Sequence, residues 1–401
     1  MNELSSLGLI LLLALAAGHL VKFVRVPEVS GYILAGVVLG PSVLGWVSAQ
    51  NLAALEVLSE VALGLILFSI GTVFEVSRFR RVGIVVLQLT LWESALAALI
   101  VVGGMLALGL RWQTALLLGA IAMATAPAST LMVIRENDSE GPLTDSLLSI
   151  IALNNIYCIT AYSLAAAAIE LASGLGRPAS PLVVLYAALY PLVWQLVGSV
   201  ALGFLVGLLL AKWASSVTET GETLILLGGS ILFCVGAARV LDLSPLIASM
   251  AVGATVVNLT HRSQPLFETL QKADPPFYAI FFVLAGADLD LTLVGSLGSA
   301  GALYLIGRAA GKLVGARVGA RRLGLHVSVE RYLGLALLAQ AGLAVGLTIA
   351  TERRFPDFAP EVTAIILASV VVYEMFGPLS TRFALVRSGE ARRQREEELV
   401  I

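Results

Sequence analysis

The chain has 401 residues, of which 58% are apolar and 13% are charged, and its mean hydropathy is +0.93. Soluble globular proteins contain about 45–50% apolar and about 25% charged residues. The 25 Lys and Arg and 27 Asp and Glu leave a net charge of −2. This composition excludes a soluble enzyme, a disordered chain and a nucleic-acid-binding protein. The two cysteines, Cys158 and Cys234, both lie in apolar runs, which excludes a disulfide scaffold and a cysteine zinc site.

Apolar runs bounded by Gly, Pro or charged residues recur along the whole chain. Because a helix needs about 20 apolar residues to cross a bilayer, the runs predict an all-α integral membrane protein with about 13 transmembrane helices. We expect these helices at residues 5–24, 28–46, 53–72, 83–108, 113–134, 144–170, 190–212, 221–241, 244–260, 276–294, 297–320, 333–352 and 361–381.

Positive charges in the connections predict the orientation, because cytoplasmic loops are enriched in Lys and Arg. With the N-terminus outside, Arg308 and Lys312 lie within a span and 18 of the other Lys and Arg lie inside. The outside connections hold only Arg111, Arg177, Arg239, Arg353 and Arg354. This predicts an external N-terminus and a cytoplasmic C-terminus, in the inner membrane of a bacterium.

The two halves of the sequence resemble each other at a spacing near 215 residues. Leu118-Gly119 matches Leu333-Gly334, and Gly71 matches Gly286, while Gly36 and Gly253 match at a spacing of 217. This spacing moves each element by seven spans, an odd number, so the copies are inverted relative to the membrane. We expect a first repeat at 1–170, a linker helix at 171–215, a second repeat at 216–385 and a short charged cytoplasmic tail at 386–401. Inverted repeats are typical of secondary transporters.

Matched interruptions occur in the spans at 113–134 and 333–352. Thr125-Ala126-Pro127-Ala128-Ser129 breaks the first and Gln340-Ala341-Gly342 breaks the second. Proline lacks an amide hydrogen and glycine weakens a helix. A plain kink is the simpler explanation for either break alone, but matched breaks at one spacing favour two crossed, discontinuous helices. Thr125, Ser129 and Gln340 would then offer oxygen ligands at membrane depth.

Four ionisable side chains are predicted to lie inside the membrane: Glu93, Arg308, Lys312 and Glu374. Such groups are costly there and indicate function by default. Arg308 and Lys312 are four residues apart and share one helical face. Glu93 and Arg308 are 215 positions apart, which predicts a salt bridge between the two related helices. We expect Glu374 to lie closer to the cytoplasmic end of its span.

Asn154 and Asn155 lie together in the span at 144–170. Neighbouring helical residues project about 100° apart, so that one amide can face a cavity while the other bonds a neighbouring helix. Paired asparagines can simply join helices by hydrogen bonds. The alternative is that they are neutral ligands for an ion beside the break at Thr125.

Several ordered motifs resemble the bacterial monovalent cation:proton antiporters of the sodium/hydrogen exchanger type. They begin with VPEVSGYILAGVVLGPSVLG, LILFSIGTVFEVSRFRR, ATAPASTLMVIRE and PLTDSLLSIIALNN. FFVLAGADLDL, GRAAGKLVGA, AQAGLAVGL and EMFGPL follow in the same order. The resemblance covers about residues 25 to 385. It implies a homodimer with a dimerisation half and a mobile core that holds two crossed, partly unwound helices.

The resemblance also implies a Na⁺ or K⁺ site near Thr125, Ala126 and Asn155. In electrogenic members two aspartates occupy the positions of Asn154 and Asn155, and a lysine that matches Lys312 can pair with the first. In electroneutral members asparagine precedes aspartate. Here both positions are asparagine, so the carboxylate that binds either a proton or a cation is absent. This would leave Lys312 without its acidic partner, and we hypothesise that Lys312 or Glu93 carries any coupled proton.

The leading interpretation is a secondary transporter for a monovalent cation, working by alternating access, with H⁺ as the coupled ion and membrane lipid around it. One alternative is the same fold carrying an anion or organic solute past Arg308 and Lys312. Another is a transport-inactive sensor or assembly partner. No GxGxxG or GxxxxGK[ST] loop, HExxH or GxSxG is present, so we expect no cofactor, no nucleotide-binding domain in this chain and no enzyme.

Overall fold

The computed structural model describes residues 3–24, 26–71, 74–173, 190, 193–214, 216–217, 219–260, 263–295 and 298–392. Over these ranges the chain is helical, and a single isolated bridge between Ser139 and Ala391 is its only β pairing. Within the same ranges, eight helices are long and apolar enough to cross a membrane. The predicted all-α integral membrane class is therefore confirmed, while the count of 13 spans stays a prediction.

The chain folds into two compact units, and each unit combines an early and a late stretch of sequence. Unit 1 is Met1–Gly83 with Val193–Leu289, and unit 2 is Ile84–Leu192 with Asp290–Ile401. These boundaries differ from the predicted repeats, since each unit draws on both halves of the chain. The division into repeats, linker and tail stays a prediction, and parts of 171–215 and 386–401 lie outside the described residues.

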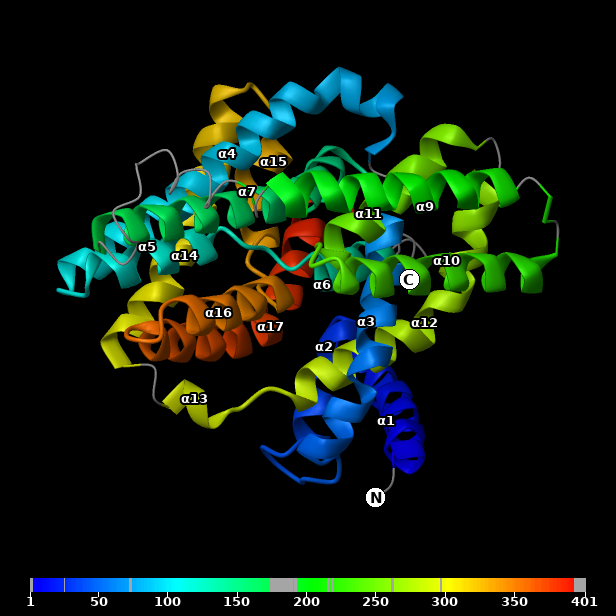
Figure 1. The fold of residues 1–401 in the computed structure, drawn as a ribbon, viewed down its shortest axis with the longest axis horizontal. Coiled ribbons are helices and arrows are strands. Elements are labelled where there is room, and N and C mark those ends of the chain that lie inside the picture. The colour runs from blue at the N-terminus through cyan, green and yellow to red at the C-terminus, as the bar shows by residue number, and fades with distance from the viewer. Residues whose placement is uncertain are drawn as a thin grey trace. The chain divides into compact units, whose positions relative to one another are not determined.

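Unit 1 is a helical bundle whose first three and last three helices pack closely together. Figure 1 labels its helices, except the short π-helix η2. They are α1 (Glu3–Phe23), α2 (Glu28–Leu39), α3 (Ala49–Gly71), η2 (Trp194–Gly198), α9 (Ser199–Ala214), α10 (Thr220–Val240), α11 (Pro245–Leu259) and α12 (Ser263–Ala287).

Glycines let helices of unit 1 approach one another closely. A Cβ at Gly253 on α11 would overlap the carbonyl oxygen of Phe68 on α3, and a Cβ at Gly36 on α2 would overlap that of Val283 on α12. Small residues let helix backbones approach in this way. Gly36 and Gly253 are the pair that matched in the sequence repeat. Their equivalent contacts support the repeat, although the opposite membrane orientation of the two copies stays a prediction.

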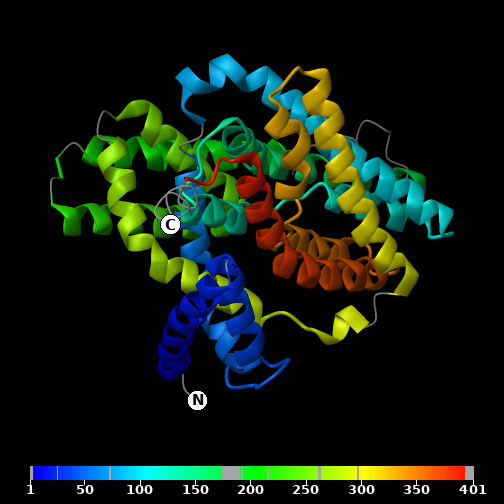
Figure 2. The same ribbon diagram turned by 180° about the vertical axis from the view of Figure 1, so that it is seen from behind.

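Unit 2 contains the helices that carry every candidate site residue. Its helices α16 and α17 lie side by side in both views (Figures 1 and 2). The helices are the part of α4 (Val76–Ala107) from Ile84 onward, α5 (Trp112–Ala122), α6 (Pro127–Glu136), α7 (Pro142–Ser173), α13 (Thr292–Gly295), α14 (Gly298–Arg322), α15 (Val327–Ala336), α16 (Gly342–Arg354) and α17 (Ala359–Ser388).

Several predicted spans differ from the observed helices in their bounds, and two of them show why. The span at 28–46 ends as a helix at Leu39, because Gly40 and Pro41 follow it. The span at 276–294 is α12, which begins at Ser263, continues through Pro275 and Pro276, and ends at Ala287. Apolar composition marks the middle of such a segment but not the turns at its ends, which depend on local capping.

The N-terminus of α7 is capped from the other end of unit 2. Glu390, which follows α17, is buried and accepts hydrogen bonds from the backbone N–H groups of Leu143 (2.8 Å) and Thr144 (2.7 Å). The hydroxyls of Thr144 (2.8 Å) and Ser328 (3.2 Å) also donate to it. A carboxylate at a helix N-terminus satisfies free amides and interacts favourably with the helix dipole. The segment after α17 is thereby fixed to α7.

Replacing Gly253 with alanine tests the glycine contact. We expect Gly253→Ala to lower the stability of the protein by about 1–3 kcal/mol, because the added methyl group has no space beside the Phe68 carbonyl. Thermal unfolding in detergent measures this effect. Gly236→Ala in α10 is the matched control, since nothing lies within 4 Å of its Cβ position. Equal melting temperatures for the two variants would contradict the close contact between Gly253 and the Phe68 carbonyl.

Candidate functional site

Two interrupted helices cross in unit 2. The chain leaves helix between Ala122 and Pro127, and again between Ala336 and Gly342. Pro127 lies in the first turn of α6, where its missing N–H costs nothing. The backbone N–H of Ala126 donates to the carbonyl of Ala339 at 2.9 Å. The two interruptions that the sequence predicts are therefore present and are bonded directly to each other.

Arg308 on α14 holds the crossing together. Its side chain is fully buried, and Nε donates to the carbonyl of Ala122 at 3.1 Å. Nη2 donates to the carbonyl of Ala124 at 2.6 Å, and Nη1 to that of Leu338 at 2.7 Å. These carbonyls stand at the C-terminal ends of α5 and α15, where helices leave acceptors unpaired and carry partial negative charge. One guanidinium therefore satisfies both broken ends at once.

Lys312 and Glu93 form a fully buried ion pair. Nζ of Lys312 lies 2.6 Å from Oε2 of Glu93, and both side chains are 0% exposed. Nζ also donates to the carbonyl of Met123 at 2.6 Å and to the Thr125 hydroxyl at 3.1 Å. The ammonium group is thus surrounded by three oxygens, two of them from the first interruption.

The predicted Glu93–Arg308 salt bridge is wrong, and so is the expectation that Lys312 lacks an acidic partner. The sequence repeat relates the positions of Glu93 and Arg308 to each other. In the structure, however, the donors of the Arg308 guanidinium bind backbone carbonyls at the crossing, because a guanidinium can donate to several acceptors at once. The single charge of Lys312, one turn further along α14, is left to neutralise Glu93.

Asn154 and Asn155 differ in their contacts. Nδ2 of Asn154 donates to Glu93 at 2.5 Å and to the Ser94 hydroxyl at 3.0 Å, while its Oδ1 is buried without a partner. Both polar atoms of Asn155 are buried without a partner among the described residues. Asn154 is thus attached to the ion pair, and Asn155 keeps its full capacity to bind a ligand.

Gln340 and Ser129 complete the predicted set. Nε2 of Gln340 donates to the carbonyl of Ile121 at 3.2 Å and to the hydroxyl of Tyr304 at 3.0 Å. The side-chain oxygens of Gln340 and Ser129 are both buried without a partner in the described part of the chain. Since buried polar atoms are normally hydrogen-bonded, each of these oxygens needs an explanation, such as water or an ion.

Three residues of the site are missing from the sequence-based prediction: Ser94, Tyr304 and Tyr373. Ser94 bonds Asn154, Tyr304 bonds Gln340, and the ring of Tyr373 lies 4.3 Å from the Arg308 guanidinium. Tyr304 precedes Arg308 by one helical turn and therefore lies on the same face of α14, so its spacing from Arg308 could have predicted its place in the site. Nothing in the sequence of α17 separates Tyr373 from an ordinary packed aromatic residue.

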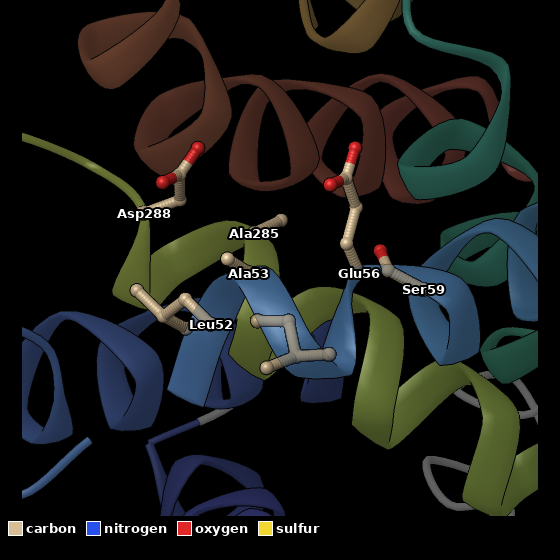
Figure 3. A pocket seen from close by; sticks show the side chains of 7 residues that line it. Leu52, Ala53, Glu56, Ser59, Ala285 and Asp288 are labelled. Atoms are coloured by element: carbon tan, nitrogen blue, oxygen red, sulfur yellow. The ribbon is translucent and has the colours of Figure 1, made fainter. Parts of the chain in front are cut away.

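Unit 1 has a separate cavity of about 360 Å³, lined by α3 and the end of α12. Figure 3 shows the carboxylates of Glu56 and Asp288 extending to the same side, with Ser59 next to Glu56. Arg239 lies 3.8 Å from Glu56 and also pairs with Glu60. The cavity belongs to unit 1 and contains none of the predicted site residues.

Comparison with known proteins identifies the family. The profile described as "Sodium/hydrogen exchanger, transmembrane" matches residues 8–387. The chain belongs to this family. It shares its fold with the sodium proton antiporter MjNhaP1 of Methanocaldococcus jannaschii, whose structure at pH 8 covers 96% of both chains at 17% identity with a TM-score of 0.69. The resemblance that the motifs carry is therefore confirmed.

Known relatives of this chain match it over only part of their own length. The ammonium/H⁺ antiporter subunit AmhT of Alkalihalophilus pseudofirmus is 24% identical over 70% of both chains. A glutathione-regulated potassium-efflux system protein of Haemophilus influenzae is 24% identical over 95% of this chain and 61% of its own. The iron transporter MagA of Paramagnetospirillum magneticum is 34% identical over 35% of this chain and 31% of its own. This chain thus spans from about a third to about seven-tenths of these relatives.

A double-mutant cycle tests the buried ion pair. Removing one partner of such a pair costs about 3–5 kcal/mol, because the remaining charge is left unpaired, whereas removing both can be nearly neutral. We expect Glu93→Gln and Lys312→Gln each to lower the melting temperature strongly, and the double variant to recover much of the loss. Thermal unfolding of the purified variants in detergent measures this. Losses that simply add would show that the two side chains do not interact.

Arg308→Lys tests the clamp at the crossing. Lysine keeps the charge but cannot reach carbonyls of both broken helices with a fork of donors. We expect stability to fall by about 3 kcal/mol, the value of one or two hydrogen bonds to a charged group. Arg317→Lys on the same helix is the control, because Arg317 is 65% exposed. If both variants melt at the same temperature, Arg308 does not hold the crossing.

Proposed function

We propose that this family member is a secondary transporter that exchanges a monovalent cation for protons by alternating access. The observation that carries the proposal is the crossing of two interrupted helices, with buried oxygens of Asn155, Ser129 and Gln340 that have no partner among the described residues. Interrupted helices at a crossing supply ligands and leave the surrounding bundle free to rock.

The cation site that we propose lies near Thr125, Ala126 and Asn155, and takes Na⁺ or K⁺. Neutral carbonyl, hydroxyl and amide oxygens suit such hard cations. The Thr125 hydroxyl already faces the Lys312 ammonium at 3.1 Å, which supports this as a place where positive charge is stabilised. Asn155 contributes an amide oxygen without a competing hydrogen bond in the described structure.

Asparagine cannot exchange a proton at physiological pH, so coupling needs another group. The Glu93–Lys312 pair is the nearest titratable group to Thr125. A cation at Thr125 would repel the ammonium, which can respond by losing a proton. Lys312 with Glu93 is therefore the proposed site of proton exchange, and binding of the cation competes with binding of that proton.

Two alternatives have less support. An anion site would need uncompensated positive charge, but Arg308 faces carbonyls and Lys312 faces Glu93. A transport-inactive sensor would have no use for buried unpaired oxygens at a crossing. The relatives and structural neighbours are named as transporters, which also argues against an enzyme.

The surroundings of the transporter are part of the proposal. We infer a homodimer surrounded by lipid in a bacterial inner membrane, with the N-terminus outside and the C-terminus in the cytoplasm. The family relationship and the bias of Lys and Arg in the connections support this arrangement.

Asn155→Asp tests the function directly. A carboxylate at this position supplies a group that binds either a proton or a cation, so we expect cation-induced proton movement to increase at least twofold. Na⁺ and K⁺ pulses to proteoliposomes that contain a pH-sensitive dye measure this movement. Asn154→Asp is the matched control, since its carboxylate would lie against Glu93 and is expected to destabilise the protein. Proteoliposomes in which neither variant nor the original chain moves Na⁺ or K⁺ would end the proposal.

A further inference from the structure

Glu374 is a buried carboxyl group that the proposed cation site does not use. It lies at the middle of α17 and is 4% exposed, and its place relative to the cytoplasmic end of the membrane span stays a prediction. The sequence also predicts that Glu374 belongs with Glu93 and Arg308 to one buried charge network. The structure contradicts this grouping, because Glu93 pairs with Lys312 and Arg308 binds carbonyls.

One oxygen of the Glu374 carboxyl is buried without a hydrogen-bond partner within the described residues. This oxygen is Oε2, and no ion pair within the same residues reaches the carboxyl. The helices α16, α15 and α6, which pack most extensively on α17, carry acidic and basic side chains that are half-buried or exposed. The other buried titratable groups on α17, α7 and α14 all have partners. These are Tyr373 with the Leu305 carbonyl, Tyr304 with Gln340, Arg308 with its carbonyls, Lys312 with Glu93, Cys158 with the Ala120 carbonyl and Tyr162 with Thr351.

A buried carboxylate without donors is unfavourable, because nothing replaces the water that would solvate its charge. Uptake of one proton turns it into a neutral carboxylic acid and removes this cost. We propose that Glu374 is a proton-binding site, separate from the Glu93–Lys312 pair, that takes a proton from water and releases it again during the transport cycle. The release of this proton during a transport cycle rests on the proposed function.

Contacts of α17 connect Glu374 to the crossing. Gly377, three residues further along the same face, packs so closely on Ala339 that a Cβ there would lie 2.6 Å from the Ala339 Cα. The Thr381 hydroxyl donates to the Ala336 carbonyl at 3.1 Å. Ala336 and Ala339 are the end of α15 and part of the second interruption. Any rearrangement of that interruption therefore moves the part of α17 that carries Glu374.

This connection links the surroundings of Glu374 to the conformation of the crossing. In the conformation described here, Glu374 is closed off and holds its proton as the neutral acid. When the crossing rearranges and water reaches α17, the carboxylate becomes solvated and the proton passes to that water. The charge of the core then changes by one unit, which a cation near Thr125 can balance.

Infrared spectroscopy on the purified protein tests whether Glu374 is protonated. A buried neutral carboxylic acid has a C=O stretch that is distinct from that of a carboxylate. We expect this band in the original chain at neutral pH, lost in Glu374→Gln and shifted in Glu374→Asp. Glu361→Gln, an exposed glutamate on the same helix, is the matched control and should leave the band unchanged. Absence of the band in the original chain overturns the proposal.

Transport in proteoliposomes tests the role in the cycle. Glu374→Gln copies the neutral acid, so we expect it to keep exchange of labelled cation against unlabelled cation while proton-driven uptake falls at least tenfold. Unchanged proton-driven uptake overturns the role of Glu374 as a proton carrier. If Glu374→Gln does not fold, Glu374→Asp keeps the carboxyl and is expected to shift the pH profile of uptake, and an unshifted profile contradicts the proposal.

The two measurements separate this inference from the proposed function. Absence of cation flux in the original chain removes the proposed function and, with it, the carrier role, whereas the infrared band is decided without any transport. A present band with no flux would thus support Glu374 as a proton-binding site alone.

Discussion

The arrangement of unit 2 depends on how the broken ends of two interrupted helices are stabilised where the two interruptions meet. Each interruption leaves backbone carbonyls without helical partners in the buried interior of the unit. Arg308 satisfies carbonyls from both, and the Ala126–Ala339 hydrogen bond joins the two segments. Without a buried cationic donor at this position, the broken ends would carry unpaired acceptors and like partial charges facing each other.

The Glu93–Lys312 pair solves a different problem. A chain with two cationic side chains on one face of α14 needs a counter-charge, and α7 carries the neutral residues Asn154 and Asn155. Glu93 on α4 supplies the missing negative charge, and Asn154 becomes a donor to that carboxylate. The negative charge that balances Lys312 therefore stands on α4, while Asn155 on α7 has no partner among the described residues.

The sequence alone predicts the features that apolar runs and helix-breaking residues determine. The all-α class follows from apolar runs, and the interruptions follow from Pro127 and from Gly342 beside Gln340, because these residues act on the backbone locally. The partners of Arg308 and Lys312 were not predictable in the same way. Both are positive, four residues apart and equally close to the middle of α14, so that only the three-dimensional positions of the carbonyls and of Glu93 distinguish them. The contacts of Tyr373 and Ser94 depend likewise on tertiary packing.

Glu390 joins two parts of unit 2 that lie far apart in the sequence. Its carboxylate fastens the stretch that follows α17 to the first turn of α7, the helix on which Asn154 and Asn155 stand three turns further along. The stretch after α17 and the two amides are therefore joined through one continuous helix. The Glu140–Arg392 ion pair and the Ser139–Ala391 bridge add to this attachment, so the position of the last helix's end depends on the helix that carries the two amides.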